Sequence, residues 1–323
     1  MNTKNNWLTY FYVDADWQPS LNWIREDQNQ QCSMLINPYG FEQDKDFWDS
    51  LCKTAKEMHQ QFGEIQIGYS GGLDSEVAVL AFHHEKLPFR LSTIEWYWGD
   101  RLLNGHDVKY AYDLCKELNL KTEVVKYDLK NLLLTDEWRR IAETYQAVSP
   151  YQHALLVVLE QVKDPWLQVD EIETLISFDS DTPKWIFEKR EDQDMCWRKF
   201  NQITGLPALN NFFTYRLETV DGWYRNQTVQ DLINFKTYGK LGFISSKHKI
   251  YQEHCPYKLT PRPKYFGLES MAGVWDNNIV DRIDTLVIDN HMGVPATEFC
   301  SIIEQQRPYS NVYYKKTRLP RSI

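Results

Sequence analysis

The stretch "IQIGYSGGLDSEVAVL", residues 65–80, decides the fold. It begins with an apolar run that is typical of a buried strand, turns through serine and glycine, and continues as an apolar-periodic helix. The first turn of a helix leaves backbone N–H groups without acceptors, and the helix dipole adds partial positive charge there. A strand that meets such a helix end through a glycine turn therefore predicts a site for an anion.

The residue types in this turn suit a phosphate. Gly71 and Gly72 let the main chain come close to a ligand and take backbone angles barred to other residues. Ser70 and Ser75 add hydroxyl donors. Asp74 would repel a bare phosphate, so its presence suggests a Mg²⁺ ion that bridges to phosphate oxygens. The alternative is a structural glycine turn in which serine and aspartate cap the helix.

Strand-like and helical patterns alternate around this stretch. We expect strands at 65–69, 89–98, 121–128 and 172–178, and helices at 44–61, 74–84, 105–120, 129–148 and 151–163. Alternation of this kind predicts an α/β fold with a doubly wound parallel sheet. Ligands of such sheets bind at the carboxyl ends of the strands, so the glycine turn lies where a ligand is expected.

The chain divides into three parts by composition. Residues 1–43 form a small β-rich N-terminal segment, 44–183 the α/β domain, and 184–323 a mainly helical region with a basic tail. Within this last part we expect a charged helix from residue 184, further helices broken at Gly222, a loop over 240–275 and a helix from Pro295.

Bulk properties exclude several classes of protein. The 323 residues carry a net charge of −9, which argues against broad, non-specific nucleic-acid binding. No apolar stretch approaches the ~20 residues of a membrane helix, so we expect no membrane contact. The six cysteines are scattered without a CxxC pair, which favours reduced thiols and a cytoplasmic location. The N-terminal residues do not resemble a signal peptide.

Residues 70–75 match the SGGxDS signature, and through it the chain resembles the PP-loop, or N-type, ATP pyrophosphatases, with their adenine nucleotide alpha-hydrolase-like fold. Tyr69 before the motif is most similar to the asparagine and argininosuccinate synthetase versions. The wider resemblance covers about 64–181. It implies that ATP is cleaved between its α and β phosphates, that AMP is attached to a substrate oxygen, and that ammonia or another amine displaces the AMP.

The resemblance also implies roles for single residues. Main-chain amides of the loop and two hydroxyls would hold pyrophosphate, and the residues concerned are Ser70, Gly71, Gly72, Leu73, Asp74 and Ser75. Asp74 would also bind Mg²⁺. The end of the second strand, Ile94, Glu95 and Trp96, would lie beside the adenine. Trp96 has an alternative role as a core or lid residue.

Two weaker sets of residues supplement the loop. Asp179 and Asp181 are candidates for a second metal-binding acidic site; Asp170 and Glu171 compete with them, and surface turn acids are the alternative for both pairs. The stretch 245–270 is basic, and its cations are Lys247, Lys249, Lys258, Arg262 and Lys264. We expect Arg262 and Lys264 to act as catalytic cations that offset charge on the departing pyrophosphate, against the alternative of a solvated basic loop.

Sequence features that are absent limit the partners that we expect for this chain. Asn2 stands where one glutaminase class needs an N-terminal cysteine, and 43 preceding residues are too few for a glutaminase domain, so none is expected in cis. The zinc site of 7-cyano-7-deazaguanine synthases is absent too. A small-molecule acceptor, not identified by the sequence, is expected. Alternatives are a nucleic-acid-modifying thiolase or aminator, which would bind through 247–264 or the basic tail, and a non-catalytic nucleotide-binding module.

The second half, with its "PRPKYFGLES" loop, also resembles stand-alone asparagine-synthetase-like proteins of tailed phages. That resemblance implies a phage-encoded protein that acts in the cytoplasm of its host.

Overall fold

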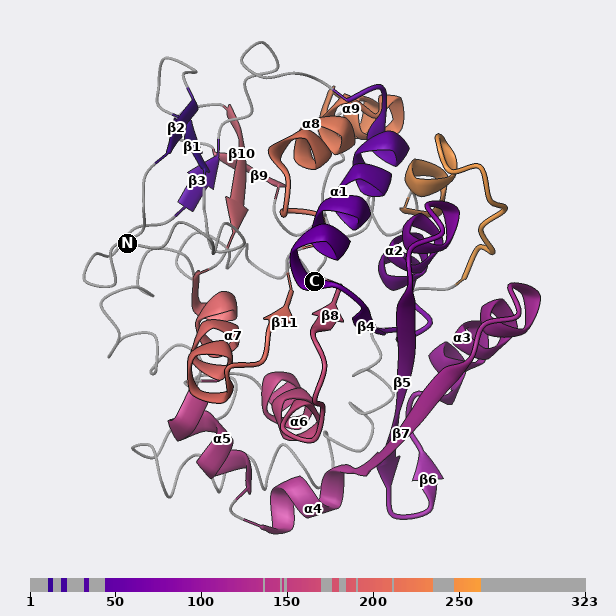
Figure 1. The fold of residues 1–323 in the computed structure, drawn as a ribbon. Helices are drawn as coiled ribbons and strands as arrows, with labels where there is room; N and C mark the ends of the chain where they lie inside the picture. Colours follow the sequence, from indigo (N-terminus) through magenta and orange to yellow (C-terminus); the bar gives the residue numbers. More distant parts are fainter. Residues whose placement is uncertain are drawn as a thin grey trace, which may run out of the picture.

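The computed structural model has an α/β fold built on a sheet in which parallel pairing dominates (Figure 1). This confirms the predicted doubly wound sheet. The structure describes residues 11–13, 19–21, 32–34, 44–135, 137–145, 147, 150–169, 176–179, 184–189, 191–210, 212–234 and 247–262. After residue 184, most of the described residues lie in helices, as expected.

Among the described residues, the main sheet contains five parallel strands. They are β4 (Ile65–Gly68), β5 (Phe89–Trp98), β7 (Thr122–Asp128), β8 (Trp166–Gln168) and β11 (Ala208–Leu209). Both β4 and β7 pair with Leu91 and Ser92 of β5, so they lie on opposite edges of that strand. The parallel order is therefore β11-β8-β4-β5-β7. The short β6 (Arg101–Leu102) folds back antiparallel on the last residues of β5.

Helices cover both faces of this sheet. Their bounds are α1 (Phe47–Phe62), α2 (Leu73–His84), α3 (Gly105–Glu117), α4 (Leu129–Leu134), α5 (Glu137–Tyr145), α6 (Pro150–Leu159), α7 (Glu191–Thr204), α8 (Leu217–Arg225) and α9 (Gln227–Asn234). One apolar core joins the sheet to α1, α2, α3 and α8, and a second joins it to α6 and α7. No helix among the described residues is long and apolar enough to cross a membrane.

Alternation along the short strands explains the two cores. In β8, Trp166 belongs to the core with α6 and α7, whereas Leu167 belongs to the core with α1 and α2. Ala208 and Leu209 of β11 divide in the same way. Successive side chains of a strand point to opposite faces, so a strand with helices on both sides of its sheet carries apolar residues on both faces.

Strand β8 corrects one prediction. The fourth parallel strand is Trp166–Gln168, not 172–178. Part of the expected stretch is a strand, β9 (Ile176–Asp179), but it pairs antiparallel with β10 (Lys184–Lys189). In turn, β10 pairs with β3 (Cys32–Met34), so the expected helix at 184 begins as a strand. The N-terminal strands β1 (Phe11–Val13) and β2 (Pro19–Leu21) form an antiparallel pair.

Other boundaries also differ from expectation. Helix α8 continues through Gly222, and the break comes at Asn226 instead. Residues 247–252 are helical inside the expected loop. The helix predicted from Pro295 lies outside the described residues. The division at residue 183 stays a prediction, although the parallel sheet takes β11 from beyond it.

Gly222 permits the close packing of α8 on α1. A Cβ atom at this position would lie 3.0 Å from Phe47 Cα, which is backbone and cannot move aside. In an open helix position, glycine-to-alanine replacement stabilises by about 1 kcal/mol. We expect Gly222→Ala to destabilise instead, by about 1–3 kcal/mol, because the added methyl overpacks this contact.

Urea unfolding of the purified chain measures this effect. Gln60→Ala on the exposed part of α1 serves as the matched control and is expected to change the free energy of unfolding by less than about 0.5 kcal/mol. An increase in stability on Gly222→Ala would contradict the close α1–α8 approach.

Candidate functional site

The glycine turn, residues 70–75, lies at the point where the strand order of the sheet reverses. Strand β4 has β5 on one side and β8 on the other. The strands that follow β4 in sequence are therefore added first on its β5 side and later on its β8 side. A crevice opens at the carboxyl ends of strands at such a point, and ligands of α/β sheets bind there. The turn that follows β4 is therefore placed where the sequence analysis expects it.

Hydrogen bonds within the turn hold residues 70–75 in place at the N-terminus of α2. The Gly72 N–H donates to Ser70 Oγ at 3.2 Å, and the Ser75 hydroxyl donates to the Gly72 carbonyl at 3.1 Å. The two hydroxyl oxygens are 3.1 Å apart. Gly72 is the N-cap residue and provides no side-chain cap, so the first-turn N–H groups of α2 have no acceptor inside the helix.

The two glycines have different roles. Gly71 has a φ of +89°, and a Cβ atom there would overlap the carbonyl oxygen of Asp107 in the first turn of α3. Within the described part of the chain, a Cβ atom at Gly72 would meet only the Ser70 and Ser75 hydroxyls, at 3.3 and 4.0 Å. Gly71 is thus required by packing against α3, whereas Gly72 leaves the main chain open to an approaching group.

Asp74 is held by two residues from the helical segment 247–252. Lys247 Nζ donates to one carboxylate oxygen and the Tyr251 hydroxyl donates to the other. The Lys247 side chain is only 7% exposed, so its ammonium reaches the mouth of the turn through a buried path. In this arrangement Lys247 provides the positive charge that the resemblance assigns to Mg²⁺. The turn fits a phosphate, but Asp74 does not present a free carboxylate to a metal ion.

Glu76, in the same first turn of α2, is 3% exposed, and two described side chains bind its carboxylate. Arg262 Nη2 forms an ion pair with its carboxylate, and the Tyr69 hydroxyl donates to it at 3.2 Å. Arg262 Nη1 also donates to the Gly71 carbonyl, and its guanidinium lies 4.4 Å from the centre of the Tyr110 ring. Burial, together with Glu76, raises the pKa of Tyr69 well above its ordinary value.

The main chain at the end of β5 is bonded to Asn104. The Asn104 amide donates to the Ile94 carbonyl at 2.8 Å and accepts from the Trp96 N–H at 3.0 Å. These are the groups that the sequence analysis places beside an adenine. The Trp96 ring is buried in the core with α6 and α7, which agrees with its alternative role.

Glu95 takes a different partner set. Tyr112 donates to one carboxylate oxygen at 2.5 Å and Tyr97 to the other at 2.8 Å, with Lys126 3.8 Å away. Burial alone would raise the pKa of Glu95, but these hydrogen bonds and the Lys126 charge outweigh it and hold the pKa below its ordinary value. Glu95 is therefore a charged residue of β5 that is hydrogen-bonded to Tyr112 of α3.

The remaining candidates have side chains outside the described part of the structure. Asp179 is the last residue of β9 and pairs in register with Lys184, so it does not end a parallel strand. The side chains of Asp170, Glu171, Asp179, Asp181 and Lys264 lie outside the described residues, and their roles stay predictions. Because β8 is the fourth parallel strand, Asp170 and Glu171 are the acids that follow that strand in sequence.

Sequence reasoning missed three contributors to this site, namely Glu76, Asn104 and Tyr251, and it named Lys247 without selecting it. Lys247 was one of several cations in a basic stretch, and its position 173 residues after Asp74 gave no sign of contact. The signal available for Glu76 was an acid inside an otherwise apolar helix, which requires a buried partner. Four cysteines with described side chains are free and buried, and these are Cys52, Cys115, Cys196 and Cys255.

Comparison with known proteins gives only distant similarities. No family model matches the chain, and no curated protein matches it significantly. Among solved structures, NMN synthetase from Francisella tularensis is similar at 13% identity and a TM-score of 0.30, covering 68% of this chain and 98% of that one. The tRNA thiolase NcsA from Methanococcus maripaludis is similar at 13% identity and a TM-score of 0.29, covering 80% and 79%.

A glutamine-dependent NAD+ synthetase from Acinetobacter baumannii is similar at 12% identity and a TM-score of 0.30. That similarity covers 80% of this chain and 46% of the synthetase. At these TM-scores the similarities carry no argument about function, so the case for the site depends on its own geometry.

The Glu76–Arg262 ion pair is expected to be a major contributor to stability of the turn. Arg262→Met leaves a buried carboxylate with Tyr69 as its remaining described partner, and we expect a loss of about 3–5 kcal/mol in the free energy of unfolding. Replacing both residues with methionine removes the unpaired charge and is expected to restore most of that loss.

Thermal and urea unfolding of the two single variants and the double variant measure this coupling. Arg90→Met is the matched control, because Arg90 pairs with Asp164 at the surface, where both side chains are more than 40% exposed. That control is expected to cost about 1 kcal/mol or less. Additive effects of the two methionine replacements would contradict direct pairing.

Proposed function

We propose that this chain binds ATP with its phosphates at the N-terminus of α2 and cleaves the bond between the α and β phosphates. AMP passes to a carboxylate or amide oxygen of a small-molecule acceptor, and ammonia or another amine then displaces it. The observation that supports this most directly is the glycine turn at the strand-order reversal, where the Gly72 main chain is open and helix amides point outward.

The turn has the donors that a pyrophosphate requires. First-turn amides of α2 and the hydroxyls of Ser70 and Ser75 lie on one short segment, and Ser70 is exposed. Hydrogen bonds from backbone amides to an oxyanion are shorter and stronger than those between neutral groups. Because these donors are fixed by the packing of Gly71 on α3, little reorganisation is needed when a phosphate arrives.

Lys247 is the cation best placed to meet the phosphates. Its ammonium already lies at the mouth of the turn on Asp74, so a small rotation would exchange a carboxylate oxygen for a phosphate oxygen. Arg262 has a different role in this proposal. Its three guanidinium nitrogens contact the Gly71 carbonyl, Glu76 and the Thr260 carbonyl, so it positions the turn. Asp74 would hold Mg²⁺ only after Lys247 has moved away from it.

The adenine site is proposed at the end of β5. The Ile94 carbonyl and the Trp96 N–H form an acceptor and donor pair of the kind that an adenine edge can bind. Asn104 now satisfies both groups, because its amide offers the same pattern of donor and acceptor. Adenine binding at this place therefore requires the Asn104 side chain to turn away, at the cost of two hydrogen bonds that the base restores.

Product analysis tests the reaction. The purified chain is incubated with ATP labelled at the α-phosphate, Mg²⁺, ammonium and a low-molecular-weight cell extract as a source of acceptor. We expect labelled AMP together with pyrophosphate. Asp74→Asn replaces the charged carboxylate with a neutral amide, and we expect it to reduce formation of both products by about 100-fold or more. Asp113→Asn, at an exposed position of α3, is the control and is expected to keep wild-type turnover.

The products distinguish the alternatives. Formation of ADP and inorganic phosphate would contradict cleavage between the α and β phosphates. Turnover that depends on added RNA or DNA would favour a nucleic-acid-modifying enzyme. Binding of ATP without turnover in any extract would favour a nucleotide-binding module. Full turnover by Asp74→Asn would show that this carboxylate is not needed.

A further inference from the structure

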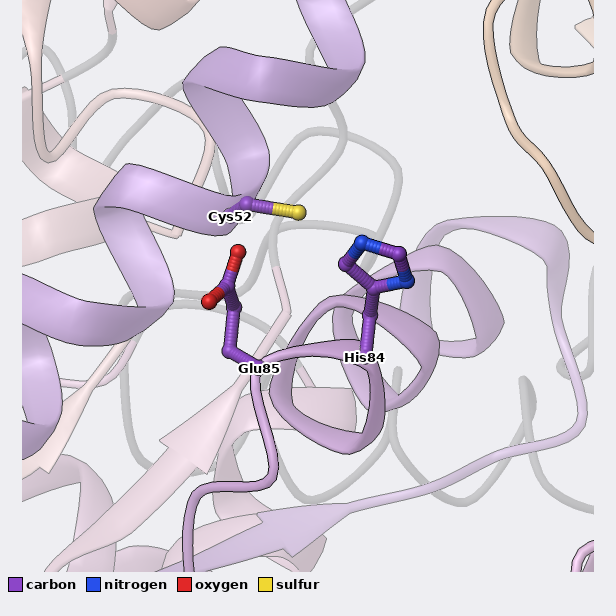
Figure 2. Close-up of side chains that lie close together, drawn as sticks. All are labelled: Cys52, His84 and Glu85. Carbon is purple, nitrogen blue, oxygen red and sulfur yellow. The ribbon is translucent and has the colours of Figure 1, made fainter.

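A second group of chemically active side chains lies at the opposite end of α2 from the glycine turn. Cys52 lies on α1, His84 is the last residue of α2, and Glu85 is its C-cap residue. One ligand atom of each, the Cys52 sulfur, a ring nitrogen of His84 and a carboxylate oxygen of Glu85, lie within 4.8 Å of one another. Figure 2 shows the three side chains pointing into one space between the two helices.

We propose that Cys52, His84 and Glu85 form a binding site for a divalent metal ion of the zinc type. Thiolate, imidazole and carboxylate are the three kinds of side chain that bind zinc, at about 2.0–2.3 Å from the ion. Two ligands of one tetrahedral ion are then about 3.5 Å apart, so atoms that lie within 4.8 Å of one another must close by up to about 1.3 Å. His84 is exposed and can supply this by rotation.

The surroundings favour a cation. His84 and Glu85 stand at the C-terminal end of α2, where the helix dipole is negative. The Tyr257 hydroxyl lies 3.4 Å from Nδ1 of His84, which leaves Nε2 as the nitrogen for the ion. A partner on the second ring nitrogen fixes the orientation of a metal-binding histidine. Three protein ligands leave a fourth position open to water or another small ligand.

Lys56 supplies positive charge to the group in the present structure. Its ammonium lies 2.6 Å from a Glu85 carboxylate oxygen, while its side chain is 48% exposed and can move into solvent at little cost. Burial and the neighbouring Glu85 charge raise the pKa of the Cys52 thiol well above its ordinary value. Binding breaks the S–H bond, forms a bond from sulfur to the metal, and releases the proton to solvent.

Cobalt and zinc titrations of the full-length purified chain test the site. We expect one equivalent of Co²⁺ to bind and to produce the charge-transfer absorption of a cobalt–thiolate bond, and Zn²⁺ to displace it. Cys52→Ser is expected to abolish this absorption, and His84→Gln to weaken binding by about tenfold or more. His84→Gln guards against misfolding, because it changes an exposed side chain.

Two matched controls belong to the same experiment. Cys115→Ser changes another buried free cysteine, and His83→Gln changes the neighbouring histidine of α2. Both are expected to keep the cobalt absorption. A wild-type chain that binds no cobalt or zinc would overturn the proposal, as would absorption that persists in Cys52→Ser.

Lys56→Gln is expected to raise the affinity for the metal ion, whereas the ligand variants lower it. It removes the ammonium that competes for Glu85, so metal affinity is expected to rise by about two- to five-fold, the factor that corresponds to a surface ion pair of about 0.5–1 kcal/mol. Unchanged or weaker binding would contradict the part of the proposal that makes Glu85 a ligand. None of these readouts depends on ATP turnover, so failure here is distinct from failure of the proposed reaction.

Discussion

The buried charge of Glu76 organises the region around the glycine turn. A carboxylate in the first turn of a helix that is otherwise packed in the core needs a cationic partner, because an unpaired charge at such a position is strongly destabilising. Arg262 provides it from 186 residues away along the chain. This pairing brings the segment 247–262 onto α2, and with it come the two side chains that hold Asp74.

The glycine turn serves the fold and the site through different atoms. Gly71 brings the chain against α3, and that packing fixes the direction in which α2 begins. Gly72 keeps one side of the main chain open in the turn between β4 and α2. A single substitution at either glycine would therefore fail for a different physical reason: overlap with α3 at Gly71, and a blocked approach at Gly72.

Local patterns were sufficient for the strands and helices that carry strong periodicity, and insufficient for contacts between distant residues. The runs that become β4, β5 and β7 contain β-branched or aromatic residues and are each followed by a turn or a helical pattern, so their type and order could be predicted. Strand β8 has three residues, and the more strand-like run after it became part of the antiparallel sheet instead. Likewise, the SGGLDS motif identified the turn, but no local pattern could show that Lys247 reaches Asp74 or that Asn104 closes the end of β5.

The segment 247–262 contacts both ends of α2, a helix about 18 Å long. Lys247, Tyr251 and Arg262 hold its first turn, whereas Tyr257 packs on His84 at its last. A ligand that drew Lys247 away and displaced this segment would change the contacts of the histidine at the other end. In that case occupancy of the two ends would be thermodynamically linked, and each ligand would alter the dissociation constant of the other by the same factor.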